Sequence, residues 1–146
     1  MKTILRGAIF AALLSCVPAV AHAQQQCVWG TPQWEGWDLV NGAVTNHFSK
    51  VTVPCNGGIL ACQGRVLVLY WIYDFDLWAW VPYGSHPNAA YEPGPTLCGN
   101  SFTYTTYAAD ALFPSGAMIR QQLAFQKKVG STWSVIGIAN HDFVVP

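Results

Sequence analysis

Charged side chains are scarce in this sequence: aspartate, glutamate, lysine and arginine make up only 10% of its 146 residues, whereas 52% are hydrophobic. Disordered chains have low hydrophobicity, so this composition excludes an intrinsically disordered protein. The few basic residues form no cluster, and a phosphate-binding surface needs one; we therefore expect no nucleic acid partner. The surface must be covered largely by neutral polar residues, glycine and aromatic rings.

Beyond its first residues, the sequence lacks an apolar run long enough to cross a membrane as a helix. Such a span needs about 18 or more consecutive apolar residues. The longest candidate, residues 65–83 (RVLVLYWIYDFDLWAWVPY), is interrupted by Asp74 and Asp76. Heptads, internal repeats and long helical patterns are lacking too. We expect no membrane span.

Residues 1–23 have the features of a secretory signal peptide. Lys2 and Arg6 precede an apolar stretch over residues 8–20, and Ala21-His22-Ala23 has the small-x-small form of a cleavage site. Cys16 opens the alternative of a lipoprotein signal, although a leucine stands where a small residue is usual. We expect cleavage after Ala23 and a protein that is secreted, periplasmic or on the cell surface.

Residues 24–146 carry five basic and seven acidic side chains, a formal net charge of −2, and their number suits a single domain. Four cysteines remain in this part, and an even number in an exported chain predicts two disulfides. Three connectivities are possible, of which we favour Cys27–Cys55 with Cys62–Cys98. No Cys-x-x-Cys pair occurs and the histidines are scattered along the sequence, so we expect no metal site and no cofactor.

Strand-like segments recur about every ten residues between turns rich in glycine, proline and asparagine. Val66–Tyr73 is apolar throughout and predicts the central strand of a sheet, with a turn at residues 74–76 and a return strand over Leu77–Val81. Asn41-Gly42 predicts a type I′ hairpin turn. Near the C-terminus, Ile119, Leu123 and Phe125 alternate with polar residues as in a half-buried strand.

These strands predict an all-β protein, an antiparallel two-sheet β-sandwich over residues 24–146. Cys62, Trp71 and Cys98 stand in the order of the cysteine, tryptophan and cysteine of immunoglobulin domains. The two cysteines are too close together, and Thr96 occupies the position of a tyrosine. We therefore expect at most an immunoglobulin-like architecture and recognise no specific family. Trp71 and Trp133 are predicted to belong to the core.

Residues that could carry catalysis are few. Asp74 and Asp76 could form the carboxylate pair of a glycoside hydrolase, but aspartates flanking a turn more often accept hydrogen bonds from backbone amides. Ser85 and His86 are adjacent in a loop, and adjacent residues of a strand point to opposite faces. No Gly-x-Ser-x-Gly motif supports a serine nucleophile. We expect no enzyme.

The aromatic residues are the main functional signal, with 7 Trp, 6 Tyr and 7 Phe. A domain of this size cannot bury every tryptophan, and exposed aromatic rings bind ligands and partners. We predict a ligand-binding surface made of Trp78, Trp80, Tyr83 and Tyr91. The function expected is an exported, non-catalytic module that binds a glycan or another extracellular ligand. The alternatives are a structural or self-associating surface subunit, favoured by the low charge, and a secreted hydrolase or enzyme inhibitor.

Overall fold

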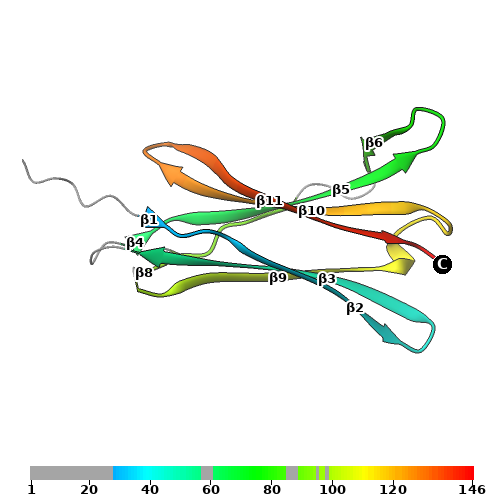
Figure 1. Cartoon of the computed structure of the whole chain (residues 1–146), viewed down its shortest axis with the longest axis horizontal. Helices are drawn as coiled ribbons and strands as arrows, with labels where there is room; N and C mark the ends of the chain where they lie inside the picture. The colour runs from blue at the N-terminus through cyan, green and yellow to red at the C-terminus, as the bar shows by residue number, and fades with distance from the viewer. Residues whose placement is uncertain (1–27, 57–60, 85–88, 95, 98) are drawn as a thin grey trace, which may run out of the picture.

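The computed structural model describes residues 28–56, 61–84, 89–94, 96–97 and 99–146. They form two antiparallel sheets that lie as two layers, with β10 and β11 in one layer and β3 and β9 in the other (Figure 1). This confirms the prediction of an all-β protein with two antiparallel sheets. Within the described residues, no helix has the length and apolar character that a membrane span requires.

The first sheet is built around one long strand. β3 (Val44–Asn56) pairs along one edge with β1 (Val28–Trp29) and β2 (Gln33–Asn41), and along the other edge with β9 (Ser101–Ala109). The β2–β3 hairpin expected at Asn41-Gly42 is present, but its register pairs Asn41 with Val44. The turn residues are therefore Gly42 and Ala43, and Gly42 takes the positive φ of 66° that glycine tolerates.

The second sheet has the order β11-β10-β5-β6, and β7 also pairs with β5. Its strands are β5 (Gly64–Asp74), β6 (Ala79–Pro82), β7 (Ala89–Tyr91), β10 (Met118–Val129) and β11 (Thr132–Val144). The predicted central strand is confirmed, because β5 has partners along both edges. The return strand begins later than predicted, since residues 75–78 form the turn and Trp78 has a φ of 52°.

Two smaller features complete the fold. β4 (Ala61–Cys62) and β8 (Thr96–Leu97) form a separate two-stranded sheet. A short 3₁₀ helix, η1 (Asp110–Leu112), follows β9 directly. This helix matters for the site because it carries Asp110 to the end of the first sheet.

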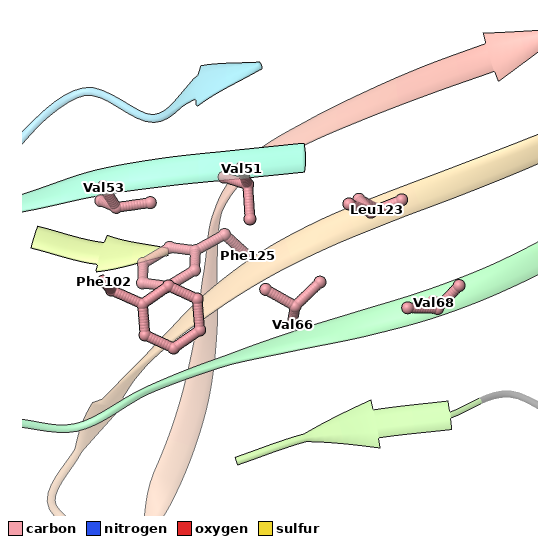
Figure 2. Packing of buried hydrophobic residues seen from close by; sticks show 7 residues of the cluster. All are labelled: Val51, Val53, Val66, Val68, Phe102, Leu123 and Phe125. Carbon is pink, nitrogen blue, oxygen red and sulfur yellow. The ribbon is translucent and has the colours of Figure 1, made fainter. Parts of the chain in front are cut away.

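The core between the sheets consists of two apolar clusters. The larger cluster joins side chains of β3, β5, β9 and β10, and within it the rings of Phe102 and Phe125 pack edge to face (Figure 2). Its buried members are Val51, Val53, Val66, Val68, Phe102, Leu123 and Phe125. The smaller cluster lies further along the sandwich and contains Ala108, Phe113, Ile119, Phe143 and Val145. Burying a large apolar side chain contributes about 1.5–3 kcal/mol, so these clusters supply much of the stability.

The prediction that Trp71 and Trp133 belong to the core is wrong. Val66 and Val68 of β5 point into the core, and side chains alternate along a strand, so Trp71 lies on the outer face of the second sheet. It is only partly buried there. Trp133 is also partly exposed, and its ring is covered by the guanidinium group of Arg65 at 4.4 Å.

Candidate functional site

A layer of buried polar side chains separates the two apolar clusters. The inner face of β3 changes from Val53 and Val51 to Ser49 and His47, which are 5% and 3% exposed. On the opposite sheet Gln121, fully buried, stands between Ile119 and Leu123. Burying polar groups is unfavourable unless they are hydrogen-bonded. Apolar side chains at these positions would pack a sandwich core equally well. We therefore take the buried polar layer as the first candidate site.

His47 lies between two aspartates. Its Nδ1 is 2.8 Å from Oδ1 of Asp38, the residue directly opposite on β2, and its Nε2 is 2.8 Å from Oδ1 of Asp110. The second oxygen of Asp110 accepts a hydrogen bond from the backbone N–H of Thr45. The ring of Phe143 stacks on the imidazole with a centroid separation of 3.5 Å. The orientation of His47 is thus held on three sides.

A second histidine reaches the same aspartate from the other sheet. Nε2 of His141, on β11, lies 3.2 Å from Oδ1 of Asp38, the oxygen that also contacts His47. Nδ1 of His141 is 3.5 Å from the hydroxyl of Ser49. The potential ligand atoms of Asp38, His47 and His141 all lie within 4.8 Å of one another. His47 and His141 are therefore close in space although they are far apart in the sequence, so their separation along the chain does not argue against a metal site.

Ser49 contacts His141 and His141 contacts Asp38, in the order of a serine-hydrolase triad. The hydroxyl of Ser49, however, does not donate its hydrogen bond to the histidine. Ser49 donates its hydrogen bond to Oε1 of Gln121 at 2.5 Å. Gln121 in turn donates through Nε2 to the hydroxyl of Tyr70 at 3.0 Å. Burial raises the pKa of Tyr70, and the hydrogen bond from Gln121 opposes that effect. A nucleophilic serine needs a hydrogen bond to its base, so this geometry favours a structural role for Ser49.

A cleft of about 160 Å³ runs along this polar layer between β2–β3 and β10–β11. Gly36, Ser49, Asn140 and His141 line it, together with Glu35 and Lys50. The side chain of Asp38 is 48% exposed and that of His141 is 18% exposed, whereas His47 is almost completely buried. A small ligand can therefore approach the layer from the side of Asp38 and His141.

The second candidate site is a row of three aromatic rings on the outer face of the first sheet. Trp37, Phe48 and Tyr107 are directly opposite one another on β2, β3 and β9. Trp37 stacks on Phe48 with centroids 5.2 Å apart and planes 5° apart, and Phe48 contacts Tyr107 at 5.5 Å. Trp37 is 40% exposed and Tyr107 is 61% exposed. We call these three residues the aromatic row.

The four residues predicted to bind a ligand occupy different environments. Trp78 is 79% exposed at the β5–β6 turn. Trp80 packs against Tyr73 and is covered by the guanidinium group of Arg120 at 4.1 Å. Two hydrogen bonds of 2.7 Å to Asp142 hold this guanidinium in place and raise its pKa.

Of the other two predicted residues, Tyr83 packs toward the interior, whereas Tyr91 is 42% exposed. Tyr83 contacts Phe113 beside the smaller apolar cluster, and Tyr91 stacks on Tyr104 at 4.4 Å. Trp80, Tyr83 and Tyr91 thus each have a different aromatic partner, namely Tyr73, Phe113 and Tyr104. Ser85 and His86, considered above as a catalytic pair, lie outside the described residues.

Asp74, which precedes the β5–β6 turn, has the turn-stabilising role expected from the sequence. Oδ1 of Asp74 accepts hydrogen bonds from the backbone N–H groups of Asp76 and Leu77, at 2.9 and 3.0 Å. The carboxylate thereby stabilises the turn, as aspartates often do.

Sequence reasoning missed both candidate sites, although the buried polar layer left a signal in the sequence. On β3 the apolar alternation of Val53 and Val51 continues as Ser49 and His47, so polar residues occupy positions that face the core. For the aromatic row no local signal exists, because its three members come from three separate strands and meet only through sheet pairing.

No family model and no curated protein matches the sequence. Among solved structures, the fold is similar to one described as "Crystal Structure of the Putative ApaA Protein from Bordetella pertussis". The two sequences are 12% identical, the match covers 84% of this chain and 97% of the other, and the TM-score is 0.44. A similarity at this level says nothing about function.

Proposed function

We propose that this protein is an exported, non-catalytic binding module that recognises a glycan through the aromatic row of Trp37, Phe48 and Tyr107. The observation that carries the proposal is the exposure of Trp37 and Tyr107, at the two ends of this row of contacting rings, on an open sheet face. Aromatic rings bury much apolar area with little loss of conformational entropy, and large exposed apolar groups on a small domain mark interaction sites.

A glycan is favoured because hydrogen-bonding groups surround the aromatic row. Sugars present C–H groups that pack on aromatic rings and hydroxyls that need polar partners. Lys50 lies two residues from Phe48 on the same face and pairs with Glu35, with 3.2 Å between Nζ and Oε2. Thr105 is the partner of Lys50 on β9 and is exposed. Charged, hydroxyl and aromatic groups thus lie together on one face.

A second candidate function is self-association as a structural surface subunit. It is favoured by aliphatic side chains at the end of the β2–β3 hairpin, where Leu39, Val40 and Val44 are 53%, 68% and 40% exposed. Exposed apolar groups on an edge strand such as β2 favour contact with another copy.

The proposal includes export and disulfides. Residues 1–23 act as a cleaved signal peptide, the mature protein is residues 24–146 with an immunoglobulin-like architecture, and Cys27, Cys55, Cys62 and Cys98 form two bridges. Cys55 and Cys62 are buried with their sulfur atoms 2.7 Å apart, while Cys27 and Cys98 lie outside the described residues. Export would supply the oxidising environment that bridges need.

The test is a pull-down of the mature protein with insoluble cellulose, chitin and peptidoglycan. We expect binding to at least one of them, and a loss of at least tenfold in affinity for Trp37→Ala and Tyr107→Ala. The matched control is Trp78→Ala, which removes an exposed tryptophan from another part of the surface. If only Trp78→Ala lost binding, the glycan site would lie at the β5–β6 turn and the proposal would be wrong. No binding combined with concentration-dependent oligomers in gel filtration would favour self-association.

A further inference from the structure

Three potential metal ligands meet where the two sheets face each other. Nδ1 of His47, Nε2 of His141 and Oδ1 of Asp38 come from three strands, and all lie within 4.8 Å of one another. We propose that these three atoms bind a divalent transition-metal ion, for which Zn²⁺ is the best chemical match.

The distances between the ligand atoms suit such an ion. Bonds from Zn²⁺ to nitrogen or oxygen are about 2.0–2.2 Å, so tetrahedral ligand atoms stand about 3.3–3.5 Å apart. Oδ1 of Asp38 is 2.8 Å from Nδ1 of His47 and 3.2 Å from Nε2 of His141. The two distances from Asp38 would have to lengthen by about 0.1–0.7 Å, and the two histidine nitrogens, which lie within 4.8 Å of each other, would have to adopt the same spacing.

The nitrogen of each histidine that points away from Asp38 faces a polar group of the protein. Metal-binding histidines commonly donate their other N–H to a carboxylate or another acceptor, which fixes the ring and strengthens the ligand. Nε2 of His47 lies 2.8 Å from Asp110, whose other oxygen is held by the amide of Thr45. Nδ1 of His141 faces the hydroxyl of Ser49 at 3.5 Å. The shorter of these two contacts, with Asp110, is made by His47, which is the more buried histidine.

The negative charges of Asp38 and Asp110 would be balanced by a bound cation. Among the described residues, the ion pairs of Asp38 and Asp110 are made with histidines and with no lysine or arginine. A metal ion between these side chains would contact Asp38, His47 and His141 together.

The donor set also indicates the class of ion. Imidazole nitrogens suit Zn²⁺ and its neighbours in the first transition row, whereas Ca²⁺ and Mg²⁺ prefer oxygen ligands. Three protein ligands leave a fourth tetrahedral position. Because Asp38 is half-exposed and His141 lines the cleft, that position faces solvent, as in sites where zinc keeps a water or a ligand.

This inference does not depend on the proposed glycan site. Asp38 follows Trp37 directly on β2, and successive side chains of a strand point to opposite faces. Asp38 therefore faces His47 in the interior layer, while Trp37 faces outward. Either proposal can fail without the other.

The experiment is calorimetric titration of Zn²⁺ into chelator-stripped mature protein. We expect one ion per chain, and at least tenfold weaker binding in Asp38→Asn and in His141→Gln, which change the two more exposed ligands. Asp76→Asn, an exposed aspartate in the β5–β6 turn, is the matched control and should bind as the wild type does.

Co²⁺ provides a second readout that does not depend on stability. Its visible absorption should indicate nitrogen and oxygen ligands and should change in both site variants. Equal Zn²⁺ affinity in the wild type and both variants, no binding at millimolar Zn²⁺, or a sulfur-to-cobalt charge-transfer band would each overturn the proposal.

Discussion

The ring of His141 lies against the backbone of Gly36, on the neighbouring edge strand of the other sheet. A methyl group added at Gly36 would lie 3.3 Å from Cγ and 3.4 Å from Nδ1 of that ring. The absence of a side chain at this position thus lets His141 approach Asp38. Gly36→Ala should displace the ring by a few tenths of an ångström and weaken Zn²⁺ binding several-fold.

The melting temperature distinguishes a local effect on the metal site from general destabilisation of the fold. Alanine is otherwise preferred to glycine within a strand, by about 0.5–1 kcal/mol, so Gly36→Ala should melt within a few degrees of the wild type. Gly84→Ala is the control, because a methyl group there meets nothing within 4 Å. Unchanged Zn²⁺ affinity in Gly36→Ala would show that His141 does not need this close contact.

The second prediction compares two aromatic residues of the second sheet. Phe125 is fully buried between Phe102 and Trp29, so Phe125→Ala should reduce the free energy of unfolding by about 3–5 kcal/mol. Trp71→Ala should reduce it by less, because Trp71 is half-buried on the outer face and its buried Nε1 has no hydrogen-bond partner among the described residues. Urea unfolding measures both.

If Phe125→Ala does not fold, Phe125→Leu provides the same comparison with a smaller cavity. A larger loss for Trp71→Ala than for either Phe125 variant would mean that the outer face of the second sheet, rather than the layer between the sheets, dominates stability.

The third prediction concerns pH. Burial holds the pKa of Tyr70 above its ordinary value of 10.0. As the pH rises past 10, the tyrosine of the unfolded chain loses its proton first, so the unfolded chain binds fewer protons than the folded one. The contribution of Tyr70 to stability is therefore complete below pH 10 and is lost as the pH rises through the folded-state pKa.

Ultraviolet titration of the phenols measures this directly. Tyr70 should ionise at a higher pH than tyrosine in free peptides, and this late phase should disappear in Tyr70→Phe. A Tyr70→Phe protein that retained the late phase would assign it to another tyrosine.

The fourth prediction concerns the cysteines. We have proposed that Cys27, Cys55, Cys62 and Cys98 form two bridges, and alkylation of the exported protein under denaturing, non-reducing conditions should then add no label. Addition of four labels, measured by intact mass, would contradict it. Peptide mapping then distinguishes Cys27–Cys55 with Cys62–Cys98 from a bridge between Cys55 and Cys62, whose sulfur atoms lie close together.

Much of the fold could be predicted from local sequence patterns. The apolar run at Val66–Tyr73 marks the central strand β5, and the alternation of Ile119, Leu123 and Phe125 identifies the buried face of β10. Both signals depend only on neighbouring residues, because side chains alternate along a strand whatever lies opposite. The capping role of Asp74 is local for the same reason.

Only the tertiary structure decided which side chains of each strand face the core and which face outward. Trp71 sits in an apolar run and looks like a core residue, yet β5 turns Val66 and Val68 inward and Trp71 outward. An apolar run carries no information about which of its two faces meets the other sheet. Exposure of individual tryptophans therefore could not be derived from composition.

The candidate sites required the pairing of distant strands. His47 and His141 lie on different sheets and meet at Asp38 only because the two layers pack face to face. Trp37, Phe48 and Tyr107 become one surface only through the register of three strands. The sequence by itself determined where strands form, because strand formation depends on local alternation and turns. The packing of the sheets determined which side chains meet, because these contacts join residues far apart in the chain.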